Sequence, residues 1–173
     1  VAFLAMFALL SIAFKSYFLP LIILSALPFG FCGAVIGHVV FGKGLSMISY
    51  WGIGAACGVV INDNLVLVDY INRVRRGGKH LLEAVIEAGV VRFRPIVITS
   101  ITTFVGLMPI MLEPSVQANF LKPAVISLTC GVVLCAPVTL ILVPCLMVIG
   151  ADIKEVLGRL PQVIKRQFNP TAS

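Results

Sequence analysis

Long apolar runs make up most of this chain, and they constrain its fold more than any other feature. The runs cover residues 1–14, 18–41, 46–71, 95–112 and 123–150. A membrane-spanning helix needs about 20 predominantly apolar residues, because the hydrocarbon core is about 30 Å thick and each helical residue adds about 1.5 Å. We therefore predict an all-α, polytopic transmembrane bundle of about five spans, of which the first is truncated.

The composition agrees with a membrane location. Only 12% of the 173 residues are charged, whereas soluble domains carry about 25%. Lipid must therefore cover most of the surface. The net charge of +6 does not indicate a nucleic-acid partner, since no basic stripe is interleaved with aromatic residues. Because the chain starts at Val1 inside an apolar run, we expect it to be the C-terminal part of a longer polypeptide.

Residues 1–150 are expected to form the bundle and residues 151–173 a basic cytoplasmic tail, with a further surface helix over 152–160. Residues 72–94 form a hydrophilic insert between two spans. Within it, apolar residues recur at helical spacing, which predicts a short amphipathic helix at the cytoplasmic surface; they are Leu81, Leu82, Val85, Ile86 and Val90. Pro95 then begins the next span, because proline is favoured in the first turn of a helix.

Glycines indicate where helices come close together. Gly33 and Gly37 form a small-xxx-small step, which permits close contact between membrane helices. Gly52, Gly54 and Gly58 likewise place little side-chain bulk on the span over 46–71. We expect all of them to allow close backbone approach.

Basic residues lie mostly on one side of the membrane if the spans alternate in direction. Lys43 and Lys122 fall on one side, and the other eleven fall on the opposite side: Lys15, Arg73, Arg75, Arg76, Lys79, Arg92, Arg94, Lys154, Arg159, Lys165 and Arg166. Lysine and arginine are enriched in cytoplasmic loops. The 72–94 insert and the C-terminus are therefore predicted to be cytoplasmic.

Asp63 is the most unusual residue, since it lies in an apolar run about 12 Å from the cytoplasmic end of its predicted helix. A carboxylate at such a depth is costly and marks a candidate functional site. With Asn62 and Asn64 it forms a polar cluster that suits an ion or proton relay. The alternative is a hydrogen-bonded clamp between helices. Asp69 is better explained as a solvated helix end beside Arg73.

Hydroxyl groups give the span over 95–112 a polar beginning, with Thr99, Ser100, Thr102 and Thr103 close together. They can form a stripe facing Asp63, or they can bond to carbonyls of their own helix. Arg92 fits a cytoplasmic anchor. No metal-spaced His or Cys set, phosphate-binding loop or nucleophile motif is found, so we expect no enzyme, no metal and no cofactor.

The order of several motifs resembles resistance–nodulation–division (RND) transporters over about residues 1–150. The matching pieces are Gly58–Asp69 with Ile71-Asn72, Gly78 to Glu83-Ala84 and Glu87-Ala88, Arg92–Ile96, Thr99-Ser100 and Gly106–Pro109. The resemblance implies helices eight to twelve of a twelve-helix bacterial inner-membrane pump, driven by protons, that exports drugs, lipophilic compounds or metals. It also implies a homotrimer with periplasmic adaptor and outer-membrane channel partners.

The resemblance also implies site residues. In the family, the tenth helix faces an acidic pair on the fourth helix, and together they relay protons. Here that tenth helix is the run over 46–71, which carries Asn62, Asp63 and Asn64. Well-studied multidrug pumps have Lys-Asn where this chain has Asn62-Asp63, so no lysine ammonium is available. Thr99 and Arg92 match a functional threonine and an arginine of the family. A non-transporting membrane scaffold or assembly protein and a protein-export accessory subunit remain alternatives.

Overall fold

The computed structural model describes the backbone of residues 2–168 and the side chains of residues 3–153. Six helices follow one another within the described part of the chain: α1 (Ala2–Phe14), α2 (Phe18–Leu24), α3 (Leu27–Val40), α4 (Met47–Arg76), α5 (Leu81–Leu112) and α6 (Val116–Phe168). The helical fold is the one expected for lipid, where every backbone polar group must be satisfied within the protein.

Four segments are long and apolar enough to cross a membrane: Phe18–Val40, Met47–Arg76, Leu81–Leu112 and Val116–Ile153. A shorter apolar helix, Phe3–Phe14, precedes them. The predicted all-α polytopic bundle is therefore confirmed, with a short apolar helix at the position of the first of the five predicted spans. Residue 1 and residues 169–173, at the end of the predicted tail, lie outside the described residues.

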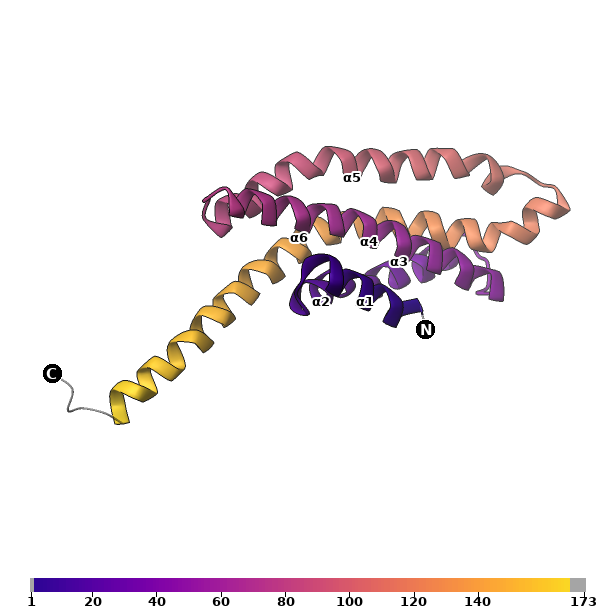
Figure 1. Cartoon of the computed structure of the whole chain (residues 1–173). Coiled ribbons are helices and arrows are strands. Elements are labelled where there is room, and N and C mark those ends of the chain that lie inside the picture. The colour runs from indigo at the N-terminus through magenta and orange to yellow at the C-terminus, as the bar shows by residue number, and fades with distance from the viewer. Residues whose placement is uncertain (1, 169–173) are drawn as a thin grey trace.

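α6 is central to the bundle, since it packs against α2, α3, α4 and α5. Figure 1 shows α4, α5 and α6 running along one another, while α1, α2 and α3 lie on the side of α4 away from α5. The largest apolar core joins α1, α2, α4, α5 and α6 near the end of the bundle where α4 meets α5, around Ile23, Leu67, Ile71, Ala88 and Val143.

The span over 18–41 contains a break that the sequence analysis did not predict. α2 ends at Leu24 and α3 begins at Leu27, with Ser25 and Ala26 between them. Pro28 has no N–H group for the helical bond to Leu24, which explains why the helix is interrupted here. The hydroxyl of Ser25 donates to the carbonyl of Ile22 at 2.6 Å. The break therefore leaves backbone carbonyls in the bundle interior that need other partners.

Two predicted boundaries are wrong. Pro95 does not begin a helix, because residues 81–94 and the following span form one continuous helix, α5. A proline inside a helix removes one hydrogen bond, and membrane helices tolerate this loss. α6 likewise begins at Val116 rather than 123, where the Ser115 hydroxyl accepts a hydrogen bond from the N–H of Ala118, and the tail continues the same helix instead of forming a separate one.

Glycines set the closest helix crossings. A Cβ atom at Gly37 would lie 2.5 Å from the Cβ of Cys130, and one at Gly52 would lie 2.1 Å from the carbonyl oxygen of Ala124. The predictions for Gly33, Gly37 and Gly52 are thus confirmed: all three allow α6 to approach closely. Those for Gly54 and Gly58 are wrong, since both face open space.

Candidate functional site

The three residues of the polar cluster on α4 lie in different surroundings. Asn64 is fully buried, Asp63 is half-buried and Asn62 is exposed. Successive residues on a helix point about 100° apart, so only one of the three can face the interior directly. Asn64 occupies the interior position, and Asp63 lies at the edge of the buried face.

Asn64 bridges α4 to the helix break. Its side-chain N–H donates to the carbonyl of Ile23 at 3.3 Å, which is one of the groups at the end of α2. Its own carbonyl oxygen, Oδ1, is buried and has no partner among the described side chains and backbone. Asn64 therefore acts as an interhelical clamp and also brings an unsatisfied acceptor into the bundle.

Asp63 has no hydrogen bond or ion pair within the described part of the chain. A carboxylate in the centre of a span costs about 2.5–3.5 kcal/mol on insertion scales. Asp69 behaves differently, because it forms an exposed ion pair with Arg73 at 3.2 Å, one turn further along the helix. The interpretation of Asp69 as a solvated helix end beside Arg73 is confirmed.

The hydroxyl groups of α5 all donate to carbonyls of their own helix. Thr99 donates to Pro95 at 3.0 Å, and Thr103 donates to Thr99 at 2.8 Å. Ser100 and Thr102 do the same. This is the back-bonded alternative raised by the sequence. The Thr99 hydroxyl lies one turn after Pro95, and its oxygen still has lone pairs that can accept a hydrogen bond.

Arg92 belongs to α5, and its side chain contacts α4. Its guanidinium carbon is 5.3 Å from the centre of the Tyr70 ring, within the range of a cation–π interaction. Its Nε atom is buried without a hydrogen-bond partner among the described residues. Arg92 is thus held by the protein and is more than a surface anchor.

Sequence reasoning missed a polar group beside Arg92. The Tyr70 hydroxyl donates to Glu87 at 3.4 Å, and the ammonium of Lys79 pairs with the same carboxylate. The hydrogen bond to Glu87, followed by its charge, raises the pKa of Lys79. These residues come from α4, α5 and their connection, so no local spacing in the sequence could have revealed the group.

The contacts of Tyr70 fix the depth of the site. Tyr70 contacts both Glu87 and Arg92 on the antiparallel helix α5. Asp63 lies seven residues before Tyr70 on α4. On the antiparallel helix α5, the same depth is reached seven residues after Glu87 and Arg92, at residues 94–99. Asp63 and Thr99 are therefore at similar depth, although no contact joins them. Within the described residues, no three His, Cys, Asp or Glu side chains are grouped as a metal site.

The part of the chain whose motifs resemble RND transporters also matches a known protein family. Residues 1–150 match the AcrB/AcrD/AcrF family. The chain is 32% identical over 144 residues to the multidrug resistance protein MdtC of Proteus mirabilis, an alignment that covers 83% of this chain and 14% of that relative. The chain thus spans about one seventh of the length of the curated relative that it matches.

Proposed function

Because this chain belongs to the AcrB/AcrD/AcrF family, with residues 1–150 matched, we propose that it is part of the membrane domain of an efflux transporter driven by the proton gradient. The chain supplies a multi-pass helical bundle with four candidate spans. Its contribution is to proton coupling, and not to an enzymatic reaction.

The observation that carries the proposal is the half-buried, unpartnered carboxylate of Asp63 in the middle of α4. A carboxylate in this position is stabilised either by protonation or by a nearby cation. Its charge state therefore depends on the supply of protons to this position. That dependence is what a coupling residue needs, and Asp69, which is exposed and paired with Arg73, lacks it.

The neighbouring residues support Asp63 in distinct ways. Asn64 fixes α4 to the broken helix α2 through the carbonyl of Ile23, so a change at Asp63 can reach that break. Asn62 is exposed on the same turn and Thr99 lies at the same depth on α5. Arg92, stacked on Tyr70, holds the two helices together at the cytoplasmic side of this level.

The remaining features of the transporter follow from the family. We place the protein in the bacterial inner membrane, with the α4–α5 connection and the C-terminus in the cytoplasm. Substrates are drugs, lipophilic compounds or metals; the name of the relative, a multidrug resistance protein, favours drugs. A homotrimer with a periplasmic adaptor and an outer-membrane channel is the proposed assembly, and further helices of the polypeptide supply the carboxylates that face Asp63.

The test replaces Asp63 in the complete transporter polypeptide that carries this chain. Export is measured in proteoliposomes with an imposed pH gradient. Asp63→Asn and Asp63→Ala should each reduce proton-dependent export by about tenfold or more, because the titrating group is lost. Asp69→Asn on the same helix is the matched control and should retain export. Full export by both Asp63 variants would make the residue a structural one and would contradict its proposed role in proton coupling.

A further inference from the structure

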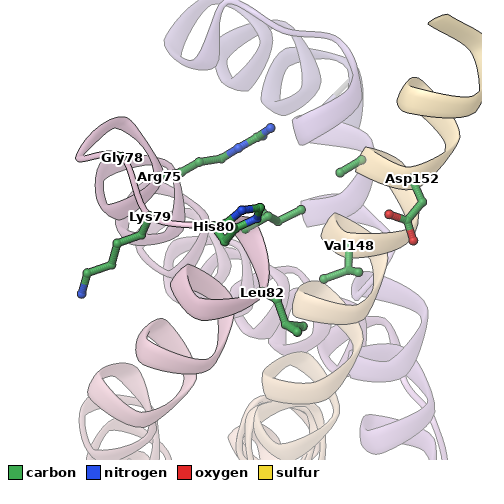
Figure 2. A pocket seen from close by; sticks show the side chains of 9 residues that line it. Arg75, Gly78, Lys79, His80, Leu82, Val148 and Asp152 are labelled. Carbon is green, nitrogen blue, oxygen red and sulfur yellow. The ribbon is translucent and has the colours of Figure 1, made fainter. Parts of the chain in front are cut away.

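An open cavity of about 800 Å³ lies where α4 ends, α5 begins and α6 leaves the bundle. Figure 2 shows Arg75 and His80 on one side of it, and Val148 and Asp152 of α6 on the other. Its volume falls in the range of small-molecule sites, about 300–1,000 Å³. The cavity is large enough to take a polar group of several heavy atoms.

Two oppositely charged side chains line this cavity without forming an ion pair with each other. Arg75 and Asp152 both line it, yet neither takes part in an ion pair or a hydrogen bond within the described residues. Lys79 also lines the cavity, but its ammonium is paired with Glu87 and is directed away from Asp152 in Figure 2. Among the described residues, the cavity therefore offers a cationic group and an anionic group on opposite walls, neither of which has a partner.

The polar cavity continues into an apolar groove. A smaller cavity of about 120 Å³ shares Arg75, Leu81 and Ala151 with it. This small cavity in turn shares Phe18, Ile22 and Gly150 with a groove of about 270 Å³ between α2 and α6. The groove is otherwise lined by Leu21, Ser25, Leu146, Ile149 and Ile153. A polar compartment thus joins an almost entirely apolar one at the end of the membrane spans.

From this arrangement we infer that the cavity and groove bind one membrane phospholipid with a phosphoethanolamine headgroup. The Arg75 guanidinium donates to the phosphate, with the His80 ring beside it, and the lipid ammonium is paired with Asp152. One acyl chain lies along the groove between α2 and α6. Basic pockets between helices at the cytoplasmic boundary are suited to phospholipid headgroups, and arginine recognises phosphate with paired hydrogen bonds.

The acidic wall selects the headgroup. Phosphatidylglycerol carries the same phosphate but no ammonium, so it leaves the Asp152 carboxylate without a countercharge. Free inorganic phosphate lacks both the ammonium and the acyl chains, and it leaves the groove empty. Charge complementarity at Arg75 and Asp152, together with the continuous groove, therefore favours phosphatidylethanolamine over both.

The groove also depends on a close contact between helices. A Cβ atom at Gly150 would lie 2.2 Å from the ring of Phe18. A leucine at this position would have to displace that ring and would occupy the groove with its own side chain. Gly150→Leu therefore blocks the acyl site without altering either charge of the headgroup site.

The inference is tested on the full chain by native mass spectrometry. The protein is exchanged into micelles that contain equal amounts of phosphatidylethanolamine and phosphatidylglycerol, and the retained lipid is counted. The wild type should retain one phosphatidylethanolamine in preference to phosphatidylglycerol. Arg75→Gln should lower retention of both lipids by about tenfold, because a charge-assisted hydrogen bond to phosphate is lost. Arg76→Gln, which removes the same charge one residue away and lines none of these three cavities, is the control.

Two further variants separate the headgroup from the chain. Asp152→Asn should abolish the preference between the two lipids while phosphate binding persists, and Gly150→Leu should reduce retention of both. Helix content by circular dichroism confirms that each variant is folded. Preference for phosphatidylglycerol, equal loss in Arg75→Gln and Arg76→Gln, or displacement of the lipid by inorganic phosphate would overturn the inference. These readouts measure binding only, so they are independent of proton-coupled export.

Discussion

Asp63 and Asn64 are adjacent on α4 but have different roles, because they differ in burial. Asn64 lies in the interior and satisfies the Ile23 carbonyl at the α2–α3 break. Asp63, one position earlier, is half-buried and unpartnered among the described residues. The sequence predicts a polar site at this depth. It could not indicate which residue faces inward, because the rotation of α4 depends on packing against α2 and α6.

The clamp at Asn64 gives a prediction at the residue scale. Asn64→Ala removes the donor to Ile23 and leaves a buried carbonyl unsatisfied. The free energy of unfolding should fall by about 1 kcal/mol, since hydrogen bonds between membrane helices average about 0.6 kcal/mol and an unpaired buried carbonyl costs somewhat more. SDS titration followed by the fluorescence of Trp51 measures this change. Asn62→Ala, at an exposed position on the same turn, should leave the midpoint unchanged, and an equal effect in both variants would rule out the clamp.

At the scale of helices, the face on which a glycine lies decides whether another helix can approach closely, and the number of glycines does not. Gly52 and Gly54 are two residues apart on α4, yet only Gly52 faces a neighbouring backbone. The small-xxx-small spacing of Gly33 and Gly37 identified a true contact, because both residues lie on one helical face. The same spacing joins Gly54 and Gly58, which meet no neighbour, whereas Gly52 makes its contact without a second glycine at that spacing. Likewise the motif rule for Pro95 failed because the helix continues through the proline, a choice that the sequence leaves open.

Replacing Gly52 and Gly54, each by alanine, tests this difference. Gly52→Ala places a Cβ atom 2.1 Å from the Ala124 carbonyl oxygen, so α4 and α6 must separate. The cost should be about 1–3 kcal/mol, as for other overpacked sites. Gly54→Ala meets open space and should be neutral or stabilising by up to about 1 kcal/mol, because alanine favours helix. The same SDS titration compares them, and equal midpoints would contradict the observed α4–α6 contact.

At the scale of the whole molecule, the apolar runs predicted the order of the long apolar helices, because lipid imposes a length on each. They did not predict that α5 packs mainly through its first half. Its buried residues are Ala84, Val85, Ala88, Ile96 and Ser100, and the helix beyond them exposes many large apolar side chains. Periodicity cannot separate lipid contact from protein contact, since both favour the same apolar residues.

The topology of the whole chain is testable by labelling. Single cysteines replace Lys43, between α3 and α4, and Arg76, at the end of α4, in a background without the five native cysteines. Both positions are exposed. In spheroplasts, a membrane-impermeant maleimide should label the cysteine at position 43, and should label the one at 76 only after lysis, because basic residues mark the cytoplasmic side. The reverse pattern would invert the proposed orientation.

The glycine crossings also have a mechanical consequence. Where α6 meets Gly33, Gly37 and Gly52, backbone faces α6 directly, and such a smooth surface has few side chains that interlock. α4, in contrast, is fixed to α2 by Asn64 and to α3 by the hydrogen bond between His38 and Ser49. Small sliding of packed helices is a known mode of domain motion. We therefore expect α2, α3 and α4 to move as one body, with α6 held against it by packing and by one weak hydrogen bond, from the Cys135 thiol to the Ala26 carbonyl at 3.5 Å.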